Sequence, residues 1–245
     1  MTHIIVESSD IADGTLRITG KDYNHIRNVL RMRPGEEISV SCGDGKEYRF
    51  GITSFEEEAV LCKLRFIKEK DAELPVQVTL FQGLPKADKM DLIVQKAVEL
   101  GVYEIVPVEC RRTIVKLDEA KKKKRVERWQ TIAESAAEQS HRSIVPKVRM
   151  PVTMEEAIGL AKDSTQYRFI PYELQGQEGT RALMEEIEEG SAVSVFIGPE
   201  GGFEEDEVAL AQEAGIRPVS LGRRILRTET AALTFLSWLI YRFEV

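Results

Sequence analysis

A glycine-rich turn directly after a buried strand is the clearest candidate for chemistry in this sequence. The apolar run Val193–Ile197 ends at once on Gly198-Pro199-Glu200-Gly201-Gly202. Glycine lets backbone N–H groups approach a ligand closely, and it accepts dihedral angles that a side chain forbids. The glycine fingerprints of dinucleotide and P-loop phosphate sites are absent, and the carboxylate of Glu200 would repel a phosphate. Two interpretations remain at this point: a loop that binds a small ligand, or a tight turn with a structural role only.

The same pattern recurs shortly afterwards and favours the first interpretation. The strand-like run Pro218–Leu221 ends on Gly222, and a loop follows that mixes apolar and basic residues: Arg223, Arg224, Ile225, Leu226 and Arg227. Apolar residues in a loop need something to cover, and a flat ring such as adenine would serve. Because ligands bind at the carboxyl ends of strands in α/β sheets, the two loops together predict a small-molecule site. Thr228, whose hydroxyl can accept from free N–H groups, is the predicted N-cap of the last helix.

The elements that would position these loops alternate regularly in the second part of the chain. Strands are predicted at 76–81, 104–108, 167–172, 192–197 and 217–221, and helices at 88–100, 118–140, 182–189, 205–214 and 228–243. Strands that alternate with helices predict a parallel sheet covered on both faces, which is the α/β fold class.

The first part of the chain has a different character. Short β-prone runs at 4–7, 15–19, 37–42, 47–55 and 59–67 are separated by turn signals, a spacing typical of a small β-barrel. One helix, predicted at 23–32, interrupts them, with Ile26, Val29 and Leu30 on one face. The charged stretch Lys68–Glu73 precedes Pro75 and is the predicted linker. The sequence therefore predicts two domains, 1–72 and 73–245.

Charge distribution adds a hypothesis about partners. The net charge is −7, yet basic residues gather at 21–33 and 111–128 while acidic residues gather elsewhere. The basic stretches indicate a surface for nucleic-acid phosphates, or else only a solvated helix face. Cys42, Cys62 and Cys110 are isolated, which predicts no metal site and a reduced, cytoplasmic compartment. No apolar run is long enough to span a membrane, and no signal peptide is evident.

Together these motifs resemble a known family over the whole chain. The turn at 198–203 and the segment Leu221–Ala231 are similar to the paired signature of the RsmE family, bacterial 16S ribosomal RNA uridine-N3 methyltransferases of the SPOUT superfamily. Further segments resemble the family's helices: 25–31, 86–90, 99–102, and 128–140 with Arg142 and Pro146.

The resemblance implies a fold, a cofactor and an oligomeric state. It implies a small N-terminal PUA-like β-barrel followed by a SPOUT methyltransferase domain with a deep trefoil knot, which dimerises through the knot region. S-adenosyl-L-methionine would bind between three loops, with the cofactor-binding residues Tyr172, Glu173, Ile197, Gly198, Pro199, Glu200, Gly201, Leu221, Gly222, Ile225, Leu226, Arg227 and Thr230. The partner would be 16S ribosomal RNA of the small subunit, held by Lys21, Arg27, Arg31, Arg33, Arg111, Arg112, Lys121, Lys122 and Arg142.

The implied reaction is methylation of N3 of one uridine, at the position equivalent to 1498 in 16S ribosomal RNA. That nitrogen carries a proton at neutral pH, so a group must accept the proton or stabilise the resulting anion. Arg227 and Arg224 are the candidates for stabilising the anion, and Glu200 is a candidate base or a brace for its own loop. The sequence leaves the proton acceptor open, as well as the choice between free RNA and an assembled subunit. Two alternatives also remain: a non-catalytic RNA-binding module, and a related enzyme that methylates a ribose hydroxyl.

Overall fold

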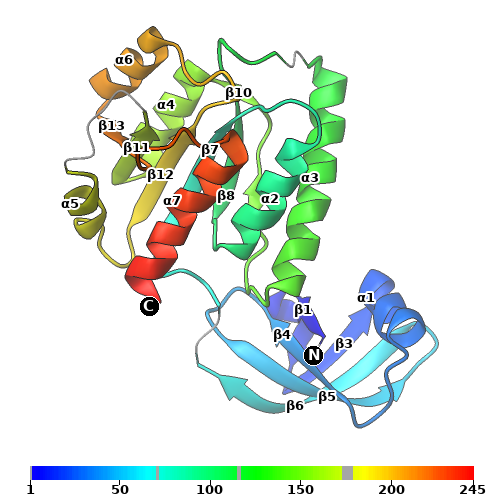
Figure 1. Cartoon of the computed structure of the whole chain (residues 1–245). Coiled ribbons are helices and arrows are strands. Elements are labelled where there is room, and N and C mark those ends of the chain that lie inside the picture. The colour runs from blue at the N-terminus through cyan, green and yellow to red at the C-terminus, as the bar shows by residue number, and fades with distance from the viewer. Residues whose placement is uncertain (1, 70–71, 115–116, 173–178) are drawn as a thin grey trace. The chain divides into compact units, whose positions relative to one another are not determined.

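The computed structural model describes residues 2–69, 72–114, 117–172 and 179–245, which form two compact units (Figure 1). The N-terminal unit comprises residues 1–73 together with Ala137–Val145, and the C-terminal unit comprises Leu74–Ala136 and Pro146–Val245. The division between Glu73 and Leu74 lies next to the boundary predicted from the sequence. The sequence placed 137–145 in the second domain, whereas in the structure this segment packs with the first unit.

The N-terminal unit is built on a six-stranded sheet among the described residues, and Figure 1 shows that this sheet is curled. Its strands, in spatial order, are β1 (His3–Ile5), β4 (Glu37–Ser41), β5 (Glu47–Phe55), β6 (Ala59–Lys68), β3 (Thr15–Thr19) and β2 (Ile11–Ala12). Only β1 and β4 pair in parallel within it. The pairing of β5 with β6 contains two register shifts, between Arg49 and Phe50 and between Ile52 and Ser54. Inward side chains such as Ile18, Ile38 and Phe50 form the core.

The helix of this unit differs from the prediction. Instead of one α-helix over 23–32, the chain forms α1 (Gly20–Asn24) and then a π-helical turn, η2 (His25–Val29); a short 3₁₀ turn, η1 (Ser8–Asp10), precedes β2. The N–H of Leu30 bonds to the carbonyl of His25, five residues back. This wider turn breaks the 3.6-residue spacing, so Ile26 is buried while Val29 and Leu30 are exposed. The predicted shared apolar face was therefore wrong for two of its three residues.

A buried ion pair connects segment 137–145 to Glu73, the last residue of segment 1–73 of this unit. The Arg142 side chain is 2% exposed and pairs with the carboxylate of Glu73. The same carboxylate accepts hydrogen bonds from the backbone N–H groups of Ser143 (2.9 Å) and Ile144 (3.1 Å). The carbonyl of Arg142 accepts in turn from Nε2 of His3 at 2.9 Å. Arg142 was predicted to bind RNA, and its burial corrects that prediction because a phosphate cannot reach the guanidinium.

The C-terminal unit is an α/β fold around a parallel sheet. Among the described residues its main path has the order β10 (Val152–Thr153), β8 (Glu104–Glu109), β7 (Gln77–Gly83), β12 (Ala192–Ile197), β11 (Tyr167–Pro171) and β13 (Arg217–Val219), and β9 (Lys147–Val148) also pairs with β8. Every pairing in it is parallel. The predicted α/β class with a parallel sheet is thus confirmed.

Helices cover both faces of this sheet, as the alternation of elements predicted. On one face α4 (Met154–Ser164) and α6 (Glu205–Glu213) pack over Phe81 and Phe196, whose rings stack with centroids 4.4 Å apart. On the other, α7 (Thr228–Phe243) packs against β12 and α2 (Lys89–Glu99), and α3 (Glu119–Gln139) lies beyond α2 in Figure 1. The remaining helix, α5 (Thr180–Glu185), begins and ends earlier than predicted.

Removing the charge of Arg142 should strongly destabilise the N-terminal unit. Arg142→Ala removes one partner of the buried ion pair with Glu73, a change that typically costs about 3–5 kcal/mol of unfolding free energy. Urea denaturation monitored by circular dichroism measures this loss. Arg17→Ala, which breaks an exposed pair with Glu56 (3.4 Å), is the control and should change stability by less than about 0.5 kcal/mol. Equal effects of the two variants would contradict a structural role for the buried pair.

Candidate functional site

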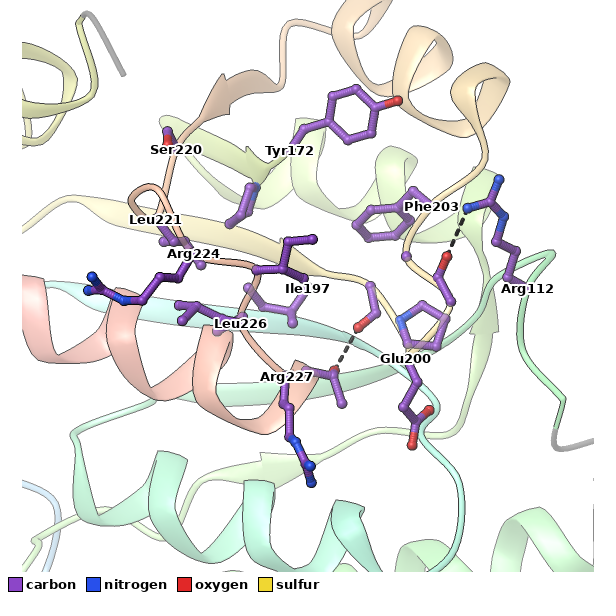
Figure 2. A pocket seen from close by; sticks show the side chains of 18 of the residues that line it. Arg112, Tyr172, Ile197, Glu200, Phe203, Ser220, Leu221, Arg224, Leu226 and Arg227 are labelled. Carbon is purple, nitrogen blue, oxygen red and sulfur yellow. Dashed lines mark hydrogen bonds between the residues drawn. The ribbon is translucent and has the colours of Figure 1, made fainter. Parts of the chain in front are cut away.

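The strand order of the parallel sheet brings three loops to one edge. β11 lies between β12 and β13, so the carboxyl ends of these strands are adjacent. Described residues at and just beyond these ends line a cavity of about 630 Å³ (Figure 2), a size suited to a ligand of nucleoside dimensions. The cavity is lined by Lys89, Arg112, Pro171, Tyr172, Ile197, Gly198, Pro199, Glu200, Gly201, Gly202, Phe203, Glu205, Ser220, Leu221, Gly222, Arg224, Ile225, Leu226, Arg227, Thr228 and Ala231.

Most residues predicted for a cofactor line this cavity. The exceptions are Thr230, which is exposed and outside the lining, and Glu173, which lies outside the described residues. The three residues predicted for catalysis, Arg224, Arg227 and Glu200, all line it. Sequence reasoning missed Lys89 from α2, and it assigned Arg112 only to RNA. Both come from distant parts of the chain, and no local pattern relates them to the glycine-rich turn.

The hydroxyl of Thr228 joins the two predicted loops to each other. It donates to the carbonyl of Gly198 at 2.6 Å and accepts from Nε2 of Gln82 at 2.9 Å. Thr228 was predicted to be the N-cap of the last helix, but the N-cap is Arg227 and Thr228 is the first helical residue. The prediction was wrong because the tertiary partner Gly198 takes the hydroxyl that a cap would have used for the helix.

The glycine-rich turn is packed so tightly that side chains would not fit. A Cβ atom on Gly83, at the end of β7, would lie 2.6 Å from Cδ of Pro199. A Cβ on Gly198 would lie 3.2 Å from the backbone of Gly202, and Gly202 itself has a φ of +70°. The glycines therefore let the turn fold back on itself against the neighbouring strand. This close approach is the structural reason for the pattern seen in the sequence.

Arg112 fastens the turn from outside. Its Nε and Nη2 atoms donate to the two carboxylate oxygens of Glu204, each at 2.8 Å, and its Nη1 donates to the carbonyl of Gly201 at 2.8 Å. Figure 2 shows Arg112 reaching this carbonyl beside Phe203. The hydrogen bonds that Arg112 donates to Glu204 raise the pKa of Arg112, so the guanidinium stays charged. The neighbouring Arg111 pairs with Asp206, and its backbone N–H donates to Glu207. Arg112 thus braces the cavity, a role that the sequence did not predict.

Glu200 is held as a carboxylate by two donors. The Nζ atom of Lys89 lies 3.0 Å from its Oε1, and the backbone N–H of Lys86 lies 3.1 Å and 3.2 Å from its two oxygens. Burial alone would raise the pKa of Glu200, but the hydrogen bonds from Lys89 and from backbone N–H groups outweigh it and lower the pKa. A carboxylate with a lowered pKa is a weak base at neutral pH. The geometry thus favours the brace over the base, the two roles that the sequence left open.

The cavity has an apolar part and a charged part. Figure 2 shows Tyr172 and Phe203 on one side of Ile197, and Glu200 and Arg227 extending together on the other. The Arg224 side chain points a different way from that of Arg227. Such a cavity can hold an apolar ring against the loops while cations meet a negatively charged group on its far side.

The basic residues predicted for RNA have varied surroundings. In the N-terminal unit, Arg31 and Arg33 are exposed. Lys21 approaches Glu138 (3.8 Å), and Arg27 lies over the rings of Tyr23 and Phe55. On α3, Lys121 pairs with Asp118 at 2.9 Å. Lys122 is largely enclosed between Glu109 and Glu119, at 3.0 Å and 3.2 Å. The exposed members keep their charge available for a phosphate.

Comparisons with known proteins agree with this geometry. Residues 72–240 match the model of an RNA methyltransferase domain, and residues 18–65 match that of an RNA methyltransferase PUA domain. Ribosomal RNA small subunit methyltransferase E of Bacillus subtilis is 37% identical, over 94% of this chain and 91% of the relative. The enzyme of that name from Neisseria gonorrhoeae, solved with bound S-adenosylmethionine, is 34% identical with a TM-score of 0.83, covering 99% of this chain and 98% of its own.

A third solved structure, a Legionella pneumophila protein in complex with S-adenosylmethionine, is 31% identical with a TM-score of 0.80, over 98% of this chain and 96% of its own. In the described part of the chain, no helix is long and apolar enough to cross a membrane. No cluster of His, Cys, Asp or Glu among the described residues could hold a metal ion. Family models and full-length relatives therefore agree, and the chain belongs to the RNA methyltransferase family that includes ribosomal RNA small subunit methyltransferase E.

Proposed function

We propose that this protein is an S-adenosylmethionine-dependent methyltransferase that methylates N3 of the uridine equivalent to position 1498 in 16S ribosomal RNA. The observation that carries the proposal is the cavity at the carboxyl ends of β12, β11 and β13, which combines an apolar wall with a cationic one. The family membership and the bound cofactor in two full-length structural neighbours support the same activity.

The lining fits S-adenosylmethionine in size and chemistry. Leu221, Leu226 and Ile197 offer apolar surfaces for an adenine ring, and the tightly folded turn at 198–202 offers backbone groups at close range. Glu205 supplies negative charge for a cationic ligand. When bound, the cofactor supplies a methyl group already activated on a sulfonium sulfur. The residues of this chain would hold it by the three loops and exclude water from its reactive side.

The remaining chemical demand falls on the uridine. Its N3 proton must leave before the nitrogen becomes a good nucleophile, and the negative charge then spreads over O2 and O4. Arg227 extends into the charged part of the cavity, where its guanidinium would stabilise that charge. Arg224 points elsewhere, so we assign it to contacts with RNA or cofactor at the rim. For Glu200, its low pKa and its donors support a role as the brace of the turn.

We also propose the finer features of the fold that the family resemblance implies. The N-terminal sheet would be a PUA-like barrel, and the segment after β12 would be threaded as a deep trefoil knot. The path of the chain supports the knot: it leaves β12, forms β13 beyond β11, and then returns in α7 to pack against β12. The enzyme would act in the cytoplasm as a homodimer joined through this region.

The nucleoside product tests the proposal directly. Small ribosomal subunits from a strain lacking the protein, incubated with the enzyme and S-adenosylmethionine, should yield N3-methyluridine when their RNA is digested and analysed by mass spectrometry. A 2′-O-methylated nucleoside would instead identify a ribose methyltransferase. A lack of methylation and of cofactor binding by calorimetry would identify a non-catalytic RNA-binding module.

Arg227→Ala should lower the turnover number by about 10²–10³-fold, the usual effect of removing one group that stabilises an anion in the transition state. The Kd for S-adenosylmethionine should change only a few-fold, because the apolar wall and the turn remain. Arg223→Ala, an exposed arginine in the same loop and outside the cavity lining, should keep wild-type turnover. Wild-type turnover in Arg227→Ala would exclude the catalytic role.

Arg112→Ala should weaken cofactor binding without acting on the methylated base. Without the bonds to Gly201 and Glu204, the turn can leave the conformation that binds the cofactor. If that conformation is populated one tenth of the time, the cofactor binds about tenfold more weakly. Calorimetry with S-adenosylmethionine measures the Kd, with Arg111→Ala as the control beside it. A Kd unchanged by Arg112→Ala would mean that the turn holds its shape without this brace.

Charge reversal on α3 tests the RNA surface. Lys123 and Lys124 are exposed, and the double variant to Glu should weaken binding to 16S ribosomal RNA. For each phosphate that the variant no longer neutralises, the plot of log affinity against log salt concentration should become shallower by about one unit. Lys162→Glu, which changes an exposed lysine on α4, is the control. Unchanged affinity in the double variant would mean that these lysines form only a solvated helix face.

A further inference from the structure

The cavity contains a lysine from outside its three loops. Lys89 is the first residue of α2, and it lines the cavity together with Arg227 and Glu200. Its Nζ atom lies 3.0 Å from Oε1 of Glu200 and 3.6 Å from Oε2 of Glu229. The two carboxylates come from the loop after β12 and from the first turn of α7. Lys89 is therefore oriented from two elements that are far apart in the sequence.

The ammonium group of Lys89 keeps hydrogen-bonding capacity for a ligand. An ammonium has three N–H donors, and Glu200 takes one of them. At 3.6 Å, Glu229 attracts the charge without a hydrogen bond, and its Oε2 is a buried oxygen with no hydrogen-bond partner among the described residues. The hydrogen bond to Glu200 raises the pKa of Lys89, so the group stays charged at neutral and mildly alkaline pH.

Arg227 supplies a second cation to the same part of the cavity. Figure 2 shows its side chain extending in the same direction as that of Glu200, the partner of Lys89. Among the described residues no hydrogen bond or ion pair is found for its guanidinium. Two cations thus line the part of the cavity that contains Glu200, and Glu200 is already engaged by Lys89 and by the N–H of Lys86.

We propose that Lys89 binds a carbonyl oxygen of the target uracil and, with Arg227, stabilises the base after its N3 proton has left to water. Glu200 and Glu229 are positioning residues that hold Lys89. The inference rests on the proposed function. In uracil, N3 lies between the acceptors O2 and O4, and the charge left by the departing proton spreads over both oxygens. A cation at one oxygen therefore favours the deprotonated base.

With Lys89 at O4 rather than O2, the same arrangement selects uracil over cytosine. Cytosine carries an amino group, a hydrogen-bond donor, at the position where uracil has O4. The N–H donors of the Lys89 ammonium group would then point at the N–H donors of this amino group. Neither group would find an acceptor, so cytosine would bind less well. Lys89 would accordingly contribute to base specificity as well as to rate.

The experiment compares Lys89→Met with Lys96→Met, a control on the same helix that breaks a Lys–Glu pair outside the cavity lining. Formation of N3-methyluridine is measured across a range of pH on small subunits lacking the modification, and the Kd for S-adenosylmethionine is measured by calorimetry. In Lys89→Met we expect about 10²-fold slower turnover near neutral pH. The Kd should rise only a few-fold, because the N–H of Lys86 still holds Glu200 and the turn. The rising limb of the pH profile should move to higher pH, because the uracil must lose its proton without the cation.

The charged groups that face Lys89 are Glu200 and Glu229, and Arg227 lines the same cavity. Lys89→Arg keeps the charge and should keep the position of the rising limb. Glu229→Gln, which loosens Lys89, should shift the limb in the same direction as Lys89→Met but by less. Two results for Lys89→Met would overturn the inference. One is a turnover number lowered by the same factor at every pH, and the other is a wild-type turnover number.

Failure of the inference is distinguishable from failure of the proposed function. Wild-type protein that forms N3-methyluridine, combined with a Lys89→Met variant of unchanged pH profile, removes only the role of Lys89. Wild-type protein that forms no N3-methyluridine removes the proposed function itself. The role in specificity can be tested on RNA that carries a cytosine at the target position. A higher ratio of cytosine to uridine methylation by Lys89→Met than by the wild-type protein would support it.

Discussion

The cavity depends on one hydrogen bond, from the hydroxyl of Thr228 to the carbonyl of Gly198. The two loops that it joins follow β12 and β13, which are not neighbours because β11 separates them. The backbone hydrogen bonds between neighbouring strands therefore do not fix these two loops relative to each other. A contact between the loops themselves has to do so. Thr228 is 4% exposed, and its hydroxyl also accepts from Gln82 at the end of β7, so the hydroxyl is satisfied as donor and as acceptor.

The glycine-rich turn cannot hold its own shape, which explains the charged braces around it. Glycines permit the close approach of Gly198 to Gly202 and of Gly83 to Pro199, but they also lose the most conformational freedom on folding. Arg112 offsets this cost from one side, and the N–H of Lys86 with Lys89 does so from the other through Glu200. Because each brace starts on a different element, the cavity keeps its shape only when the whole parallel sheet is assembled.

Local patterns in the sequence predicted the local features and missed the long-range ones. Buried apolar runs identified β12, and their repetition with helices predicted the parallel sheet. The helix α4 was missed, although Thr153 and Glu156 form a capping box before Ala157 and Ile158. Arg142 was assigned to RNA on the family resemblance, and its partner Glu73 is too distant in the sequence for a local pattern to reveal the buried pair. Likewise, no spacing relates Lys89 to Glu200, since only the folded sheet brings α2 to the glycine-rich turn.

In the mechanism that we propose, the low pKa of Glu200 determines how the chemistry is divided. A carboxylate that accepts from Lys89 and from backbone N–H groups has little tendency to take a proton near neutral pH. The uridine must then be activated by lowering the free energy of its anion. Cations that are already fixed in place when the base binds can do this. The hydrogen bonds that make Glu200 a poor base also fix Lys89 in place, so one ion pair accounts for both the rigid turn and the cationic wall. A site built in this way needs no side chain that changes its charge during turnover.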